Sequence, residues 1–398
     1  MRGWYYPIHN NQVINYFRSH TMQAVRLKLV YYSKTRVHAE TMAKPETVRF
    51  AIMGCAHIAR KVARAIALAP NATLCAVASR SLQKAQTFAA QNALPDTVAL
   101  YGSYQELLDD PTVDAVYLPL PTSLHVRWAV AAAARRKHVL LEKPAALDAA
   151  ELERILEACE SNGVQFMDGS MWLHHPRTSH MKQLLSLSHS GSIGNIQFIH
   201  STSTMQTRAG FLESNIRVKA DLDGLGALGD LAWYCIGASL WAKGYQLPAT
   251  VTALPDVTRN AAGVILSITA SLHWDQPDQT VATIHCSFLS HTSMDLAICG
   301  SNGSLHVRDF IIPYQEHVAS FDFTFGAKFV DLHIGWNVKP EEVHVANVLP
   351  QEALMVQEFA SLVATGPDNK WPQITRKTQL VVDALNKSLD LGCKPVSL

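Results

Sequence analysis

The stretch VRFAIMGCAHIARKVARAI, residues 48–66, decides the fold. An apolar run from Val48 to Met53 is followed by Gly54 and then by an amphipathic run with helical spacing. A strand, a tight turn and a helix in this order open a parallel α/β sheet. Further short apolar runs alternate with helical periods and indicate strands at 73–79, near Leu100, and at 114–120, 138–142 and 164–168. We predict a doubly wound parallel sheet over residues 43–168.

The pattern changes after residue 168. Longer runs joined by turn residues indicate mostly antiparallel strands at 193–205, 263–274, 279–290, 294–310 and 319–325. Helical periods are found only near 230–242, 351–364 and 376–391. We therefore predict a second, α+β domain over residues 169–398, with a large and mostly antiparallel open sheet.

The N-terminal residues 1–42 differ in composition from the rest. From Met1 to Ala39 there are six basic residues and no acidic one, and no helical or strand period is clear. We expect an unstructured extension. A transit peptide is the alternative, because such segments are basic and poor in acidic residues.

Composition excludes several classes of function. The formal net charge is +1, which gives no field to attract nucleic acid or acidic lipid. The seven cysteines are scattered singly, which argues against a disulfide framework or a structural zinc site and favours a reducing compartment. No uninterrupted apolar run reaches the ~20 residues that span a bilayer. We expect a cytoplasmic protein that binds a small molecule, or an organellar one if the N-terminal segment is a transit peptide.

The turn after the first strand is a degenerate form of the dinucleotide fingerprint GxGxxG, written here as Gly54, Ala56 and Ala59. The first glycine makes the tight turn, whereas alanine adds only a methyl group at the other two positions. The helix that begins near His57 and Ile58 would offer free N–H groups to a pyrophosphate. Ordinary α/β packing also uses small residues here, so the motif alone leaves both interpretations open.

The end of the second predicted strand, AVASRSLQK, favours one cofactor. An NAD site has Asp or Glu at this place to bind the ribose 2′-hydroxyl. This chain has Ser79 and Arg80 there, with Lys84 one turn later. A guanidinium matches a 2′-phosphate, so NADP is predicted in preference to NAD. The alternative is a solvated arginine at the start of a surface helix.

Two further motifs carry a family resemblance. VYLPLPTSLHVRWAV (116–130) and HVLLEKPAAL (138–147), together with Gly54, resemble the glucose-fructose oxidoreductase/inositol dehydrogenase/MocA family from about residue 47 to the C-terminus. MDGSMWLHHPR, DLDGLGALGDLAWYCI and LPQEALMVQEF resemble its plant branch of uncharacterised oxidoreductases. The resemblance implies a Rossmann domain, an NADP cofactor, a homodimer, and relatives such as dimeric dihydrodiol dehydrogenase and D-xylose 1-dehydrogenase.

The resemblance also assigns residues to the cofactor site. It places Glu142 near the nicotinamide ribose and makes Lys143 the catalytic lysine, followed by a cis proline at Pro144. Residues at the end of the fourth predicted strand and just after it are also assigned to the cofactor: Leu118, Pro119, Thr122 and His125. A lone histidine is at least as often structural, so His125 has two interpretations.

Asp230 and Tyr234 match the DxxxY form of the family pattern and would share one face of a helix. We expect Tyr234 to be the general acid/base, since the ammonium of Lys143 would help the phenol to ionise. Asp230 would orient the site or act as the acceptor for a hydroxyl group. The alternative is a buried tyrosine beside an acid at a helix N-terminus.

Trp172 and Arg177 follow the last strand of the first domain and are predicted to contact substrate, as an apolar face and a fork of donors. His174 and His175 would point apart on an extended chain, so no metal is expected. The prediction is an NADP-dependent dehydrogenase acting on a secondary alcohol of a sugar, polyol or cyclic diol. A non-catalytic NADP-binding redox sensor or scaffold is the alternative.

Overall fold

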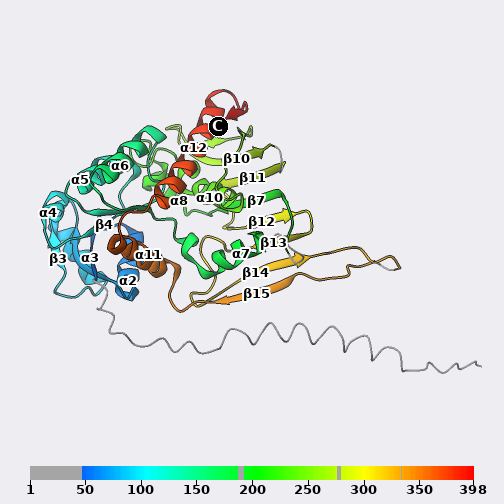
Figure 1. Ribbon diagram of the computed structural model, residues 1–398. Coiled ribbons are helices and arrows are strands. Elements are labelled where there is room, and N and C mark those ends of the chain that lie inside the picture. The colour runs from blue at the N-terminus through cyan, green and yellow to red at the C-terminus, as the bar shows by residue number, and fades with distance from the viewer. Residues whose placement is uncertain (1–46, 187–191, 276–278, 333) are drawn as a thin grey trace, which may run out of the picture. The chain divides into compact units, whose positions relative to one another are not determined.

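The computed structural model describes residues 47–186, 192–275, 279–332 and 334–398. The predicted unstructured extension, residues 1–42, lies outside these ranges. The prediction of two sheets, one parallel and one mostly antiparallel, is confirmed. In Figure 1 the parallel sheet and its helices lie at the left of the view, and the broad sheet lies at the right.

The first sheet has six parallel strands in the order β3-β2-β1-β4-β5-β6. The strands are β1 (Val48–Met53), β2 (Ala72–Ala78), β3 (Ala99–Tyr101), β4 (Ala115–Leu118), β5 (His138–Leu141) and β6 (Phe166–Asp168). The helices between them are α2 (His57–Leu68), α3 (Leu82–Gln91), α4 (Tyr104–Asp109), α5 (His125–Ala133) and α6 (Ala149–Ser161). The strand order reverses between β1 and β4. Ligands of such sheets bind outside the carboxyl ends of the strands at this point.

The second sheet has ten strands in the order β15-β14-β13-β12-β7-β11-β10-β8-β16, with β9 paired to β10. Its neighbours are antiparallel except for β7 and β11, which are parallel. The longer strands are β7 (Ile196–Thr204), β10 (Ile265–Trp274), β11 (Thr280–Ser287) and β14 (Val318–Phe325). The others are β8 (Thr250–Ala253), β9 (Thr258–Arg259), β12 (Leu296–Gly300), β13 (Gly303–Val307), β15 (Glu341–Ala346) and β16 (Val396–Ser397). Residues of β10 and β11 alternate between buried and half-buried, because one face of the sheet packs on the core.

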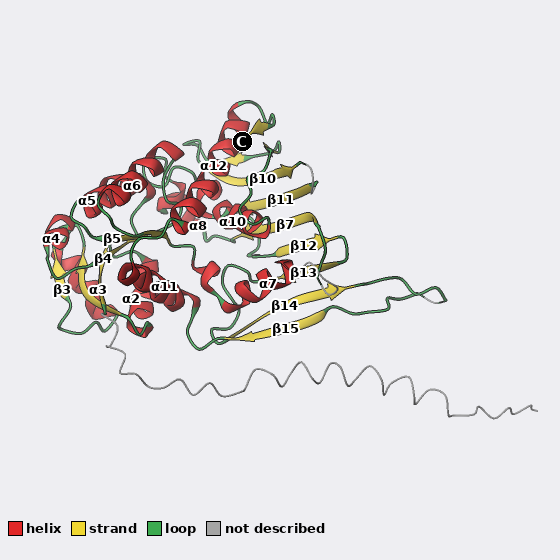
Figure 2. Ribbon diagram, viewed as in Figure 1, coloured by secondary structure: helices red, strands yellow, loops and turns green. Residues whose placement is uncertain are grey.

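Further helices follow the parallel sheet in the chain and pack around the broad sheet and between the two sheets (Figure 2). They are α7 (Pro176–Ser186), α8 (Ala209–Ser214), α9 (Ala227–Asp230), α10 (Ala232–Ala242), α11 (Gln351–Thr365) and α12 (Lys370–Asp390). Single turns of 3₁₀-helix lie at η1 (Thr122–Leu124), η2 (Met171–His174) and η3 (Ile216–Val218). α10 packs on the broad sheet, α11 packs on α2, and α12 contacts both α6 and β8. The two sheets therefore share one continuous core, which fixes the site between them.

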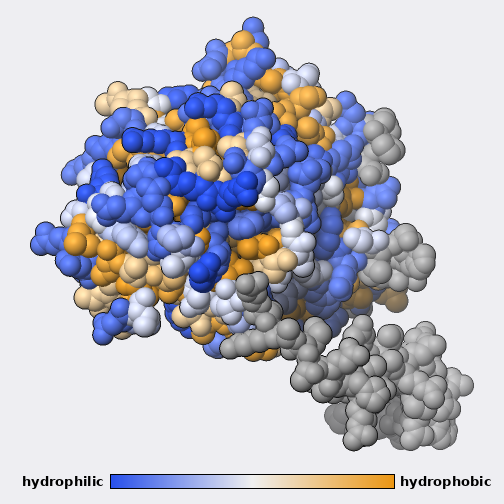
Figure 3. Space-filling model, turned by 60° about the vertical axis from the view of Figure 1, so that its left-hand side comes forward, coloured by the Kyte–Doolittle hydropathy of each residue, from blue (hydrophilic) through white to orange (hydrophobic). Residues whose placement is uncertain are grey.

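The surface is mixed in polarity. On the face that Figure 3 shows, hydrophilic residues interrupt the apolar ones. Among the residues that the structure describes, no helix combines the length and the hydropathy needed to span a membrane.

Candidate active site

Gly54 forms the turn between β1 and α2 in a backbone conformation that strongly favours glycine. Its φ is +124°, a conformation that residues with a side chain rarely adopt. A Cβ atom at this position would lie 2.8 Å from Leu120 Cδ2 and 3.4 Å from the carbonyl oxygen of Pro119. The one retained glycine of the fingerprint is thus the one that the backbone requires.

The start of α2 is open to a ligand. Ala56 precedes the helix in an extended conformation and supplies no capping oxygen, and no acidic residue lies in the first turn. His57 is exposed and Ile58 is half-buried, while Ala59 is fully buried and lets the helix pack closely on the sheet. The first N–H groups of this helix are therefore unblocked, which suits an anionic group.

The end of β2 carries two unpaired cations. Ser79 is buried and its N–H donates to the carbonyl oxygen of Tyr101 at 3.2 Å. Arg80 and Lys84 are exposed, and no carboxylate in the described part of the chain pairs with either. Burial raises the pKa of the Cys55 thiol, against the opposing effects of a Ser79 hydrogen bond and the Lys84 charge. Lys84 therefore lies close to the Gly54 turn, and these residues fit a dinucleotide with a 2′-phosphate.

The residues after β4 have mainly structural contacts. Leu118 and Pro119 are buried at the strand end. The N–H and hydroxyl of Thr122 donate to Asp223 Oδ1 at 2.9 and 3.1 Å, so the Thr122 side chain holds the segment before α9 and does not face a ligand. The two ring nitrogens of His125 lie 2.8 and 3.1 Å from the carbonyl oxygens of Leu120 and Ala145. Burial lowers the pKa of His125. These contacts favour the structural interpretation of His125 over a role in cofactor binding.

Lys143, Asp230 and Tyr234 come together at the carboxyl end of β5. Nζ of Lys143 donates to Asp230 Oδ1 at 2.6 Å and to the Asp230 carbonyl oxygen at 2.8 Å. The two side chains are 9% and 11% exposed. The same ammonium lies 4.5 Å from the centre of the Tyr234 ring. The peptide bond before Pro144 is cis, as the resemblance implied.

The Tyr234 hydroxyl is not placed as expected. The predicted single helix is interrupted at Leu231, between α9 and α10. Tyr234 is buried, and its hydroxyl lies 3.7 Å from the sulfur of Met171. Burial, the nearby Glu142 charge and the Asp230 charge raise the pKa of Tyr234 well above its usual value. The Lys143 ammonium lies over the Tyr234 ring, and among the described residues no hydrogen bond joins its Nζ to the Tyr234 hydroxyl.

Arg217, which sequence reasoning missed, completes the ionic group. Its Nε lies 2.8 Å from Asp230 Oδ1, the oxygen that Lys143 also contacts. Burial would raise the pKa of Asp230, but the charges of Lys143 and Arg217 and the hydrogen bonds they donate bring it below its usual range. The charge of Asp230, in turn, raises the pKa of Arg217. No spacing in the sequence links residues 217 and 230, since η3 and α9 are separate elements.

Glu142 has a partner that was also missed. The Tyr117 hydroxyl donates to Glu142 Oε1 at 2.5 Å. Burial raises the pKa of Glu142, against the hydrogen bond from Tyr117 and the charge of Lys143. Gly169 passes close by, and a Cβ there would lie 3.1 Å from the carboxylate. Glu142 is thus fixed beside Lys143, at the place expected for the cofactor ribose.

Trp172 and Arg177 do not face the site. Residues 171–174 form a 3₁₀-helix that turns the chain inward, where an extended segment was expected. The Trp172 ring packs edge-on against Trp241 and Phe310. Arg177 is 1% exposed and donates to Asp309 Oδ1 at 2.5 Å and to two carbonyl oxygens. Both side chains are therefore committed to the core, which corrects their expected contact with substrate.

The neighbouring histidines are likewise occupied by packing. His174 Nδ1 lies 3.0 Å from Glu358 and its ring stacks on Trp371. His175 Nδ1 accepts from the Arg177 N–H at 2.9 Å. In the ranges that the structure covers, no three His, Cys, Asp or Glu side chains gather into a metal-binding group.

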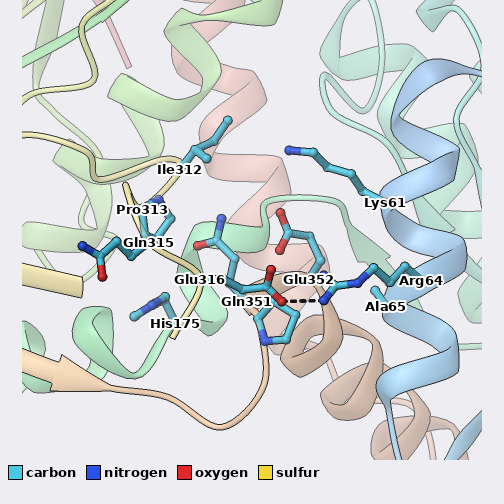
Figure 4. Close-up of a pocket in the computed structure, with 11 residues that line it drawn as sticks. Lys61, Arg64, Ala65, His175, Ile312, Pro313, Gln315, Glu316, Gln351 and Glu352 are labelled. Carbon is cyan, nitrogen blue, oxygen red and sulfur yellow. Dashed lines mark hydrogen bonds and ion pairs between the residues drawn. The ribbon is translucent and has the colours of Figure 1, made fainter. Parts of the chain in front are cut away.

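A hollow of about 210 Å³ lies between α2, the segment 312–316 and the start of α11 (Figure 4). Lys61, His175 and Gln351 are among its lining residues, and an ion pair between Arg64 and Glu316 joins its sides at 2.8 Å. None of the predicted site residues lines it. We therefore place the chemistry at Lys143 and not in this hollow.

Comparison with known proteins identifies the family. Residues 48–170 match the model of an oxidoreductase family with an NAD-binding Rossmann fold, and residues 180–306 match the GFO/IDH/MocA C-terminal domain. An uncharacterised oxidoreductase of Rhizobium meliloti is 37% identical over 356 residues, which cover 87% of this chain and 98% of the relative. The chain belongs to the Gfo/Idh/MocA family of oxidoreductases. The predicted family and the predicted NAD(P)-binding Rossmann domain are confirmed.

Two further relatives carry names that describe activity. D-xylose 1-dehydrogenase (NADP(+)) 2 of Haloferax volcanii is 34% identical over 347 residues, covering 86% of this chain and 98% of that protein. A 3-ketoreductase from Actinomadura kijaniata, solved with NADP and TDP-benzene, superposes with a TM-score of 0.73 at 25% identity and covers 86% of this chain and 98% of its own. These relatives of the Gfo/Idh/MocA chain act as a dehydrogenase and a reductase.

Proposed function

We propose that this Gfo/Idh/MocA protein is an NADP-dependent oxidoreductase that moves a hydride between the nicotinamide and a secondary alcohol of a sugar, polyol or cyclic diol. One observation carries the proposal. The Lys143 and Asp230 pair lies nine-tenths buried at the carboxyl end of a parallel strand, in a domain whose first turn has a glycine in a conformation that side-chain residues rarely adopt. The names of the xylose dehydrogenase and the ketoreductase support this class of substrate.

The residues present fit NADP. The Gly54 turn and the open start of α2 would hold the pyrophosphate, Arg80 and Lys84 the 2′-phosphate, and Glu142 the nicotinamide ribose. Bound NADP would supply the hydride chemistry. We assign residues 43–168 to cofactor binding and 169–398 to substrate binding and dimerisation, and we infer a cytoplasmic homodimer.

Lys143 is the group we assign to proton transfer. Its ammonium is held by two bonds to Asp230, so one N–H remains to meet a substrate oxygen. In the oxidative direction the amine takes the hydroxyl proton, and in the reductive direction the ammonium gives it back. The carboxylate of Asp230 fixes the position of Nζ, and the Tyr234 ring supports the positive charge from its π face.

The rival interpretation is a non-catalytic NADP-binding sensor or scaffold. A sensor needs the Gly54 turn and the cations after β2, but it has no use for a buried amine and carboxylate beside the nicotinamide site. The presence of Lys143 and Asp230 in contact therefore favours the enzyme.

The first experiment is a substrate screen. The purified protein is titrated with NADPH and then incubated with NADP⁺ and a panel of aldoses, polyols and dihydrodiols, while absorbance of the reduced cofactor is followed. Cofactor binding with turnover supports the proposal. Binding without turnover across the panel favours the sensor, and absence of NADPH binding contradicts both.

A second experiment tests the choice of cofactor. Arg80→Ala removes a charge-assisted contact to a 2′-phosphate, so we expect the Kd for NADPH to rise roughly 10- to 100-fold and the Kd for NADH to change by less than about threefold. Arg60→Ala, at an exposed arginine of α2 bonded to Asn92, is the matched control. Equal weakening of both cofactors would show that Arg80 does not bind the 2′-phosphate.

A further inference from the structure

Arg217 is the member of the ionic group that faces outward. Its side chain is 35% exposed, against 9% for Lys143 and 11% for Asp230. Within the site, the lysine and the aspartate are thus largely enclosed, and the guanidinium is the part that a solute meets first.

The hydrogen-bonding capacity around Arg217 is only partly used. Asp230 Oδ1 contacts both Lys143 Nζ and Arg217 Nε, whereas the described residues form no hydrogen bond to Asp230 Oδ2. The Nη1 atom of Arg217 lies 3.5 Å from Asn215 Oδ1, which is a weak contact. A free carboxylate oxygen therefore adjoins a guanidinium edge with free donors.

The segment that carries Arg217 is fixed in place on both sides. Asn215 accepts from the Arg217 N–H at 3.0 Å, and Asn260 Nδ2 donates to the carbonyl oxygen of Val218 at 2.8 Å. Five residues further on, Asp223 accepts two hydrogen bonds from Thr122 of the first domain. Arg217 is thus pre-positioned, as a residue that recognises a ligand requires.

The cations at the site are fully matched by carboxylates. Lys143 and Arg217 both contact Asp230, and the charges of Asp223 and Glu142 also act on Arg217. Burial raises the pKa of Tyr117 and of Tyr234 and so keeps both phenols neutral. A substrate carboxylate at Arg217 would meet the free oxygen of Asp230 and be repelled. An uncharged substrate with a hydroxyl group fits this pairing of donor and acceptor.

We propose that Arg217 selects the substrate by binding a hydroxyl oxygen on the carbon next to the one that is oxidised, while Asp230 Oδ2 accepts that hydroxyl's proton in a hydrogen bond. The substrate class is then an uncharged compound with two adjacent oxygenated carbons, such as a vicinal diol or an aldose. This inference rests on the proposed function. It adds the requirement that the substrate has an oxygenated carbon next to the one that is oxidised.

The test compares matched pairs of alcohols that differ in the adjacent hydroxyl. The pairs are trans-cyclohexane-1,2-diol with cyclohexanol, and D-glucose with 2-deoxy-D-glucose, assayed with NADP⁺. For the wild type we expect kcat/KM to be on the order of 10- to 100-fold higher with the adjacent hydroxyl, since a hydrogen bond to a charged group is worth that factor. In Arg217→Met this preference should fall to within about threefold, mainly through KM, because the donor is lost.

Three controls separate recognition from folding. Arg217→Lys keeps a donor and the charge, and it should retain part of the preference. Arg208→Met changes an exposed arginine nine residues earlier in the chain and should leave the preference intact. The Kd for NADPH should be unchanged in every variant, since Arg217 lies outside the residues assigned to the cofactor.

The outcomes that overturn the inference are distinct from those that overturn the function. If Arg217→Met lowers kcat/KM equally for both members of a pair, Arg217 only holds Asp230, and the proposed function stands. If the wild type shows no preference, the adjacency requirement is refuted. If the wild type binds NADPH but oxidises no alcohol in the panel, the proposed function fails and the inference falls with it.

Discussion

Two buried pairs of a cation and a carboxylate differ in what surrounds them. The first pair is Lys143 with Asp230, at an N–O distance of 2.6 Å. The second pair is Arg177 with Asp309, at 2.5 Å. Each cation follows a strand of the parallel sheet, and each carboxylate comes from the second half of the chain. In the Arg177 pair both carboxylate oxygens are used, since Asp309 Oδ2 also accepts from the Tyr314 N–H at 2.7 Å. In the Lys143 pair, Asp230 Oδ2 forms no hydrogen bond to a described residue.

The difference shows how a structural pair is distinguished from a chemical one. A buried ion pair is stabilised when further hydrogen bonds satisfy its remaining atoms, as two carbonyl oxygens do for Nη1 and Nη2 of Arg177, while the Nε of Arg177 has no partner among the described residues. A substrate-binding site must leave some hydrogen-bonding atoms without a protein partner, because the substrate has to bond to them. Both pairs join a buried cation to a buried carboxylate, so the contacts of the remaining atoms are what distinguish them.

The largest expected effect is on catalysis at the first pair. Lys143→Met removes the proton-transferring amine, so kcat/KM on whichever alcohol is turned over should fall roughly 10²- to 10⁴-fold. Asp230 keeps Arg217 as a partner, and the free energy of unfolding should fall by only about 1–3 kcal/mol. Steady-state kinetics and urea unfolding measure the two effects. A variant with near-normal kcat/KM would remove Lys143 from the mechanism.

The second pair should give the opposite result. Arg177→Met leaves the Asp309 carboxylate buried without its cation, which costs about 3–5 kcal/mol in the free energy of unfolding. Activity of the folded fraction and the Kd for NADPH should be little changed, because Arg177 does not face the site. The double variant Arg177→Met with Asp309→Leu should recover part of the stability. A variant of normal stability and weakened substrate binding would restore Arg177 to the substrate site.

These pairs also show what could be predicted from the sequence. The parallel sheet was predictable because its strands are buried on both faces and are therefore continuous apolar runs. The meeting of Lys143 with Asp230 came from the family motifs, since no local rule relates a strand end to a helix 87 residues later. Arg217 was missed for the same reason. Trp172 and Arg177 were wrongly expected to face the cleft because large amphipathic side chains serve cores and clefts equally well.

A smaller effect concerns the pH dependence of stability near the Arg177 pair. Burial and the Arg177 charge lower the pKa of His175 from 6.5 to about 4, so the folded state holds this ring neutral. As pH falls below 6.5 the unfolded chain takes up a proton first, and stability is lost between pH 6.5 and 4. We expect a loss of about 2 kcal/mol between pH 7 and pH 5 from this residue alone. The loss should be absent in His175→Gln, and an equal slope in both proteins would refute the assignment.

The smallest expected effect is at the Tyr234 hydroxyl, and it decides between two assignments of the proton-transfer step. Tyr234→Phe keeps the ring that lies 4.5 Å from the Lys143 ammonium and removes only the oxygen that faces Met171. If Lys143 carries the proton, kcat should fall by less than about fivefold, since a contact to a thioether sulfur is weak. A fall of ~10²-fold or more would instead match the loss of a general acid/base, and it would require the phenol to turn toward the substrate.

Tyr234→Leu separates the contribution of the ring, because it removes the cation–π contact while the pair with Asp230 remains. We expect Tyr234→Leu to lower kcat more than Tyr234→Phe does, since the buried ammonium then loses part of its stabilisation.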